Sequence, residues 1–265
     1  MRPTNTILGQ HFSIAGQLRF TFPRMLMSLF IMSYMVADGV LISCYMGTVA
    51  LASLNMIFPL AIFLGAVGIM LSAGGGSVVS RRMGAGDSAG ADRALSTLVY
   101  AEFAFGVIVG LLGILLLDPL LDFLNVNEEQ YAYAYEYQIV WLAFMPCFLL
   151  SVLSQTFFTV AGFPKLGLAV SIASGLTNVV LDIVFMGPFG WGMYGGALAT
   201  VISWIVAAVA GGIFFCRTKA PIKIILTRPD WAALKGACTS GFSEMVGSLS
   251  SSVTLYLFNA AFMYW

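Results

Sequence analysis

Seven long apolar runs are the feature that most restricts how this chain can fold. Each run is long enough to cross a hydrocarbon core of about 30 Å as a helix, and a helix satisfies its own backbone hydrogen bonds there. Only 9% of the residues are charged and 60% are hydrophobic, whereas soluble domains carry about 25% charged residues. We therefore expect an all-α integral membrane protein. The runs cover residues 20–46, 50–79, 94–117, 134–160, 166–187, 194–216 and 236–264.

The lysines and arginines all fall at one end of such a bundle. None lies in the connections that follow the first, third and fifth runs. Because positive charge is retained on the cytoplasmic side, we expect a multi-pass protein of the cytoplasmic membrane with its N-terminus inside. The acidic connection after the third run then lies outside. The basic residues are Arg2, Arg19, Arg24, Arg81, Arg82, Arg93, Lys165, Arg217, Lys219, Lys223, Arg228 and Lys235.

Several classes of function find no support in the residue pattern. The formal net charge is zero, so no basic surface for nucleic acid is predicted. The four cysteines are scattered without a C-x-x-C pair, which is typical of small core residues rather than of a metal site. No nucleophile–base pair emerges either. We therefore expect neither an enzyme active site nor a bound cofactor.

Polar side chains stand inside three of the apolar runs at a similar predicted depth. Asn178 and Asp182 are four residues apart and share one face of a helix. Counted from a basic residue at the end of its own run, Asp38 lies 19 residues in, and Asp182 and Thr200 lie 17 residues in. At a rise of 1.5 Å per residue, these three stand about 25 Å from the basic layer, with Asn178 one turn closer to it. We expect the four side chains to converge in the outer half of the membrane.

Two carboxylates at that depth, with no base beside them, indicate a cation site. Each costs about 2.5–3.5 kcal/mol to insert, and neighbouring carboxylates favour retention of a proton by one of them. Oxygen atoms from Asp38, Asp182, Asn178 and Thr200 also suit a hard cation such as Na⁺. The pattern leaves H⁺ and Na⁺ open. For Asn178 or Thr200 alone, a plain interhelical hydrogen bond is the commoner explanation.

Two further acidic residues lie nearer the basic end. Glu102 and Glu244 each follow a basic residue by nine positions. Each is expected either to face an inward cavity or to pair with a base. Glu244 is a candidate acid of such a cavity, or of a second repeat that the seventh run would open.

Four motifs, in order, resemble the multidrug and toxic compound extrusion (MATE) family. The first run contains VADGVLISCYMG, which carries Asp38. The loop after the second run is SVVSRRMGAGDSAGADRA, and the fourth run ends in SQTFFTVAGFPK. The fifth and sixth runs form the hairpin TNVVLDIVFMGPFGWGMYGGALATVIS.

The resemblance implies a parent of twelve helices in two six-helix lobes that alternates between inward- and outward-facing states. Residues 1–217 are then the N-terminal lobe, 218–235 a cytoplasmic linker, and 236–265 the first helix of a truncated second lobe. The family's N-lobe cation site maps onto Asp38, Asn178, Asp182 and Thr200.

The implied function is secondary active efflux, in which H⁺ or Na⁺ is exchanged for amphipathic, cationic organic compounds. The full-length protein is expected to be monomeric in the bilayer and to bind no nucleic acid. One alternative is a flippase for a lipid-linked or polysaccharide precursor, although no basic residue lies deep enough to hold a pyrophosphate. An alternative of another class is a seven-helix receptor or sensor, which the N-inside charge pattern opposes.

Overall fold

The computed structural model describes residues 14–217 and 220–263, and within them every regular element is an α-helix. The expectations for Arg2, Lys219 and Trp265 concern residues outside this part of the chain. The helices are α1 (Ile14–Met46), α2 (Thr48–Gly84), α3 (Ser88–Leu115), α4 (Leu117–Phe123), α5 (Glu128–Ala143), α6 (Met145–Val160), α7 (Pro164–Met186), α8 (Gly192–Cys216) and α9 (Trp231–Met263).

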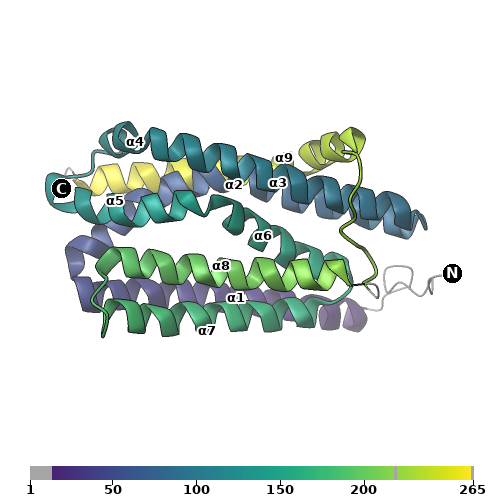
Figure 1. Ribbon diagram of the computed structural model, residues 1–265, viewed down its shortest axis with the longest axis horizontal. Helices are drawn as coiled ribbons and strands as arrows, with labels where there is room; N and C mark the ends of the chain where they lie inside the picture. The colour runs from purple at the N-terminus through teal and green to yellow at the C-terminus, as the bar shows by residue number, and fades with distance from the viewer. Residues whose placement is uncertain (1–13, 218–219, 264–265) are drawn as a thin grey trace.

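The long helices run roughly parallel to one another and form two groups (Figure 1). Helices α1, α7 and α8 pack together in the lower group, and α2, α3 and α9 lie in the upper one. Helices α5 and α6 contact both groups, because each packs against α2, α3 and α8. The connections between α2 and α3, α6 and α7, and α8 and α9 meet at one end, which we call the basic end (Figure 1). It carries the described lysines and arginines of these connections: Arg81, Arg82, Arg93, Lys165, Arg217, Lys223, Arg228 and Lys235.

Five helices are long and apolar enough to cross a membrane, namely α1 from Thr21 onward, α2, α3, α7 and α8. A sixth crossing arises if α5 and α6, which meet at an angle of 62°, count as one broken span. The run predicted over 134–160 is therefore not one continuous helix but two helices joined at a sharp bend. The break falls at Phe144, two residues before Pro146. Proline lacks the N–H that would continue the helical ladder and disfavours helical geometry in the residue before it.

Helix α9 is not among the helices that meet the length and apolarity of a membrane span. The prediction of a seventh crossing over 236–264 is therefore not supported by its composition. Its sequence includes Lys235, Glu244 and several serines, which dilute the apolar character of the helix. It packs along α2, at Gly74 and Gly241.

The contact between α2 and α9 depends on glycine. A Cβ atom at Gly74 would lie 1.9 Å from the carbonyl oxygen of Ala237, and one at Gly241 would lie 2.0 Å from that of Met70. Small residues permit this approach of two backbones. Further along α9, Ser252 donates a hydrogen bond of 2.6 Å to the carbonyl of Pro59, so that the two helices stay in contact over several turns.

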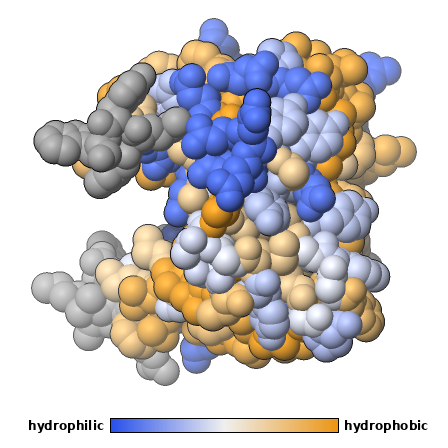
Figure 2. Space-filling model, turned by 90° about the vertical axis from the view of Figure 1, so that its left-hand side faces the viewer, coloured by the Kyte–Doolittle hydropathy of each residue, from blue (hydrophilic) through white to orange (hydrophobic). Residues whose placement is uncertain are grey.

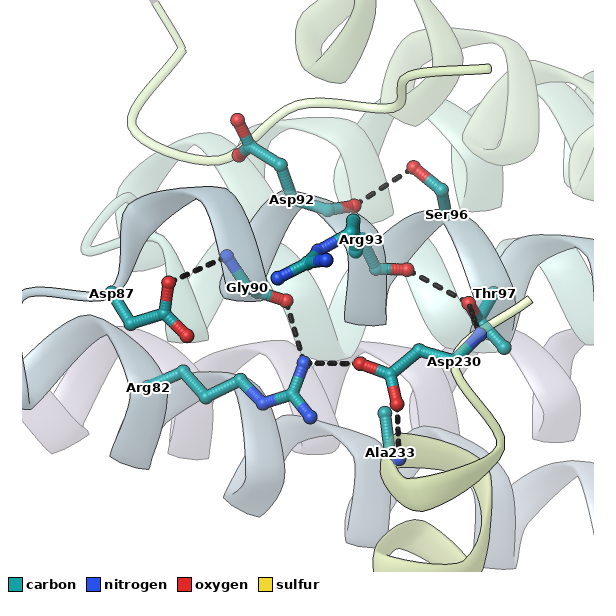
Figure 3. Close-up of polar contacts among 9 residues, drawn as sticks. All are labelled: Arg82, Asp87, Gly90, Asp92, Arg93, Ser96, Thr97, Asp230 and Ala233. Carbon is teal, nitrogen blue, oxygen red and sulfur yellow. Dashed lines mark hydrogen bonds and ion pairs between the residues drawn. The ribbon is translucent and has the colours of Figure 1, made fainter. Parts of the chain in front are cut away.

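The segment between α8 and α9 lies along α3, where polar side chains bind its backbone (Figure 3). The amide of Lys223 donates to Asp92 at 2.8 Å, and that of Ile225 donates to Ser96 at 2.8 Å. The Tyr100 hydroxyl donates to the carbonyl of Ile225 at 2.9 Å. We call residues 220–230 the docked linker.

An ion pair fixes the end of the docked linker. Arg82 of α2 donates to the carboxylate of Asp230 at 2.6 Å and to the carbonyl of Gly90 at 2.8 Å (Figure 3). The amide of Asp230 donates to Thr97 at 2.9 Å. The hydrogen bond from Arg82 lowers the pKa of the Asp230 carboxyl below its ordinary value. The pair is therefore complete at neutral pH and is lost as the pH falls through that lowered pKa.

The opposite end of the molecule carries the acidic segment that follows α3, which comprises α4 and the start of α5. Figure 2 looks onto this end and shows hydrophilic residues gathered over its upper half, with mostly apolar and weakly polar residues over the lower half. The exposed polar residues of this segment include Asp118, Asp122, Asn125, Asn127, Glu128 and Glu129. The two ends of the bundle thus differ in charge, as the sequence pattern predicted.

Replacing Gly74 with alanine should loosen the packing of α9 against α2. The added methyl group collides with the backbone of Ala237, and overpacking of this kind costs about 1–3 kcal/mol. Hydrogen exchange of the α9 amides should accelerate, and the melting temperature in detergent should fall. Gly84→Ala is the matched control on the same helix, because nothing lies within 4 Å of its added Cβ. Equal exchange rates in both variants would contradict the close contact.

Replacing Ser96 with alanine should release the middle of the docked linker. The Ile225 amide loses its acceptor, and a lost hydrogen bond costs about 0.5–1.5 kcal/mol. Hydrogen exchange at Ile225 should rise about two- to tenfold. Ser88→Ala, at the exposed start of the same helix, should leave that exchange unchanged.

Candidate functional site

A cluster of polar side chains is buried between α1, α7 and α8. Asp38 of α1 is 9% exposed, and Asn178 and Asp182 of α7 are 2% and 0% exposed. Thr200 of α8 completes the set, since the Asn178 amide donates to its hydroxyl at 3.3 Å. The structure therefore brings together the four residues that the depth count predicted to converge.

Glycines allow the helices to approach around this cluster. A Cβ at Gly175 of α7 would lie 2.7 Å from the ring of Tyr34, so α1 and α7 are in close contact one turn below Asp38. On α8, a Cβ at Gly196 would lie 3.9 Å from Oδ1 of Asp182. The carboxyl group of Asp182 thus faces α8 as well as α1.

Most acceptor atoms of the cluster lack a partner within the described residues. They are Oδ1 of Asp38, Oδ1 of Asn178, and both carboxyl oxygens of Asp182. Asp38 and Asp182 lie close enough to interact electrostatically with one another. Among the described residues the ion pair is that of Arg82 with Asp230, at the basic end, so no base compensates the two acids. Buried polar atoms without partners are costly, which favours occupation by a proton or a cation.

The donor set decides which ions suit the cluster. Carboxylate, amide and hydroxyl oxygens are the ligands preferred by hard cations, and two adjacent carboxyl groups can share a proton. In the described part of the chain no three His, Cys, Asp or Glu side chains gather as a metal site. Any cation bound here would therefore rely on Asn178 and Thr200 in addition to the two acids.

Two tyrosines at the cluster were missed by the sequence analysis. Tyr137 of α5 lies with its hydroxyl 3.4 Å from that of Thr200, and it interacts with both Asp38 and Asp182. Tyr34 precedes Asp38 by one helical turn and interacts with it. Tyr137 was not predicted as a site residue, but it is buried. Tyr34 could have been predicted from the sequence, because it lies four residues before Asp38 and therefore on the same face of the helix.

The other two acidic residues do not join the cluster. Glu244 is exposed on α9, which packs against α2 and α3 rather than against the helices of the cluster. Glu102 of α3 is fully buried, and one of its carboxyl oxygens accepts a hydrogen bond of 2.7 Å from Ser72. Its expected pairing with a base is not found, because a serine hydroxyl provides the partner.

Apolar helices of membrane-spanning length, packed around a buried acidic cluster, define a multi-pass helical membrane protein. The sequence pattern of the MatE family matches residues 23–184. The chain therefore belongs to the MatE family of membrane transporters, as the motif resemblance predicted.

Known relatives agree with this assignment. The multidrug export protein MepA of Staphylococcus saprophyticus is 26% identical over 246 residues, which cover 92% of this chain and 54% of that protein. The FAD transporter of Shewanella oneidensis is 24% identical over 90% of this chain and 55% of its own length. An outward-facing multidrug resistance MATE family transporter of known structure is 25% identical, with a TM-score of 0.84 over 92% of this chain and 54% of that one. The chain thus spans about half the length of the relatives it matches.

Replacing Thr200 with valine should destabilise the packing of α5, α7 and α8. The near-isosteric change removes the hydroxyl that joins Tyr137 and the Asn178 amide, at a cost of about 1–3 kcal/mol for buried groups left unpaired. Thermal unfolding in detergent should occur at a lower temperature. Thr177→Val is the control, because that hydroxyl bonds within its own helix to Ala173. A Thr200→Val protein as stable as the control would rule out the shared contact.

Proposed function

We propose that this chain is the N-terminal lobe, with the first helix of the second lobe, of a secondary active exporter of amphipathic organic compounds. The observation that carries the proposal is the pair of buried carboxyl groups, Asp38 and Asp182, which no base in the described part of the chain compensates. Membership of the MatE family supports a transport role for that pair. The coupling ion is H⁺ or Na⁺, since the donor set suits both.

In this proposal, the cluster works as a switch between two conformations. Binding of a proton or Na⁺ between Asp38 and Asp182 removes the repulsion between α1 and α7. Asn178 and Thr200 supply neutral oxygen atoms on the other side of the site, and Tyr137 orients the Thr200 hydroxyl. An ion that binds one conformation better than the other shifts the equilibrium by that difference in affinity. Helix α1 is the moving element, because Pro23 interrupts its hydrogen-bond ladder below Asp38.

The substrate class follows from charge. The relatives represent two kinds of substrate, since one is a multidrug export protein and another is an FAD transporter. FAD carries phosphate groups and is therefore an anion. No lysine or arginine in the described residues stands at the level of Asp38 and Asp182, so cationic and amphipathic compounds are favoured over anions. The same argument disfavours a flippase for a pyrophosphate-bearing precursor. A seven-helix receptor is disfavoured by family membership.

The position of the basic end supports an orientation as well. We propose that it faces the cytoplasm, in keeping with the distribution of lysine and arginine, and that the protein resides in the cytoplasmic membrane with its N-terminus inside. The lobe boundary at residue 217 and the linker over 218–235 remain part of the proposal. The full-length transporter is proposed to act as a monomer in the bilayer.

The test is dye export by the full-length protein that contains this lobe. Asp38→Asn and Asp182→Asn should each reduce export to the level of cells that lack the transporter, because neither amide can bind and release a proton or hold Na⁺ as a carboxylate does. Asp122→Asn is the matched control, since Asp122 is an exposed acid on the acidic connection.

The coupling ion is identified by measuring which imposed ion gradient drives export. Export from inverted vesicles should follow either a sodium gradient or a pH gradient, and the Asp38→Asn protein should respond to neither. Normal export by both aspartate variants would overturn the mechanism.

A further inference from the structure

A cavity of about 570 Å³ opens at the basic end, apart from the buried acidic cluster. It lies where the end of α2, the start of α3 and the end of the docked linker meet. Its volume falls within the range of about 300–1,000 Å³ that is common for ligand sites. The charged and aromatic side chains that line it are Arg82, Arg93, Arg228, Asp87, Asp230 and Trp231.

The two carboxylates of the cavity are already occupied by protein donors. Asp87 caps α3 by accepting a hydrogen bond of 2.8 Å from the Gly90 amide. Asp230 accepts hydrogen bonds from Arg82 and from the Ala233 amide (Figure 3). Neither aspartate therefore needs a cation from solution.

Two of the three arginines, by contrast, have no ion pair in the part of the chain that the structure describes. They are Arg93 of α3 and Arg228 of the docked linker, and both are exposed. With three guanidinium groups against two carboxylates, the cavity carries an excess of positive charge. Planar guanidinium groups bind phosphate oxygens in a bidentate manner, so phosphate is the chemistry that this cavity fits.

The surroundings of the cavity indicate where the phosphate comes from. Leu226 of the docked linker is 99% exposed, and Trp231 at the start of α9 is 72% exposed. An uncovered leucine and an uncovered indole beside a basic cavity are costly in water. At the headgroup level of a membrane they are favoured, because tryptophan prefers that zone and basic pockets at helix ends bind acidic headgroups.

We propose that this cavity binds the phosphate group of an anionic phospholipid, held by Arg93 and Arg228, with Leu226 and Trp231 in contact with its acyl chains. Arg82 remains paired with Asp230 and forms the floor of the site. The lipid then joins α3 to the docked linker from outside. This inference does not depend on the proposed export activity.

The test is a titration of the detergent-solubilised chain with phosphatidylglycerol, followed by native mass spectrometry. The double variant Arg93→Gln/Arg228→Gln should bind the lipid about tenfold more weakly than the unmodified chain, because two charge-assisted contacts are lost. Arg81→Gln is the matched control, since Arg81 is an exposed arginine next to Arg82 that does not line the cavity. It should bind the lipid as the unmodified chain does.

Three outcomes would overturn the proposal. Equal affinity of the double variant and the Arg81→Gln control would exclude the cavity as the lipid site. Equal affinity for phosphatidylcholine and phosphatidylglycerol in the unmodified chain would exclude selection for an anionic lipid. Displacement of the lipid by millimolar sn-glycerol 3-phosphate would assign the site to soluble phosphate esters instead. Circular dichroism checks that the double variant keeps its helices. If it does not, Arg228→Gln alone is tested, and its affinity for phosphatidylglycerol should fall several-fold.

Discussion

The absence of water inside an apolar helical bundle is the constraint on which the rest of this structure depends. A polar group buried there finds a partner within the protein or raises the free energy of the fold. Most serines and threonines meet this demand locally, as Ser53 and Thr177 do by donating to carbonyls of their own helices. Glu102 meets it in part, because Ser72 of the neighbouring helix donates to one carboxyl oxygen, while the other has no partner among the described residues. Four of the buried oxygens without a partner among the described residues lie together in the cluster: Oδ1 of Asp38, Oδ1 of Asn178 and both carboxyl oxygens of Asp182.

The backbone of the docked linker finds its hydrogen-bond partners in a different way. At the basic end, side chains of α3 act as hydrogen-bond partners for an extended segment that has no helix of its own. Asp92, Ser96 and Thr97 accept from backbone amides of the docked linker, and Arg82 fixes its last residue. This arrangement ties the start of α9 to α3 through polar contacts.

Much of the candidate site could be predicted because a helix has a fixed rise. Counting 1.5 Å per residue from the basic layer placed Asp38, Asp182 and Thr200 at one level, and no knowledge of the packing was needed. Tyr137 could not be found in this way. It is one of four tyrosines at alternate positions over 131–137, and which of them turns inward depends on the helix direction set by the break at Phe144.

The sequence by itself determined the helical class, the membrane location of the bundle and the separation of basic and acidic ends, because these depend on composition and on the length of apolar runs. It also determined the family, through motifs that retain their order. The tertiary structure alone decided the glycine contact of α9 with α2 and the cavity at the basic end. Each of these depends on which residues far apart in the chain come into contact, and local propensity carries no information on that.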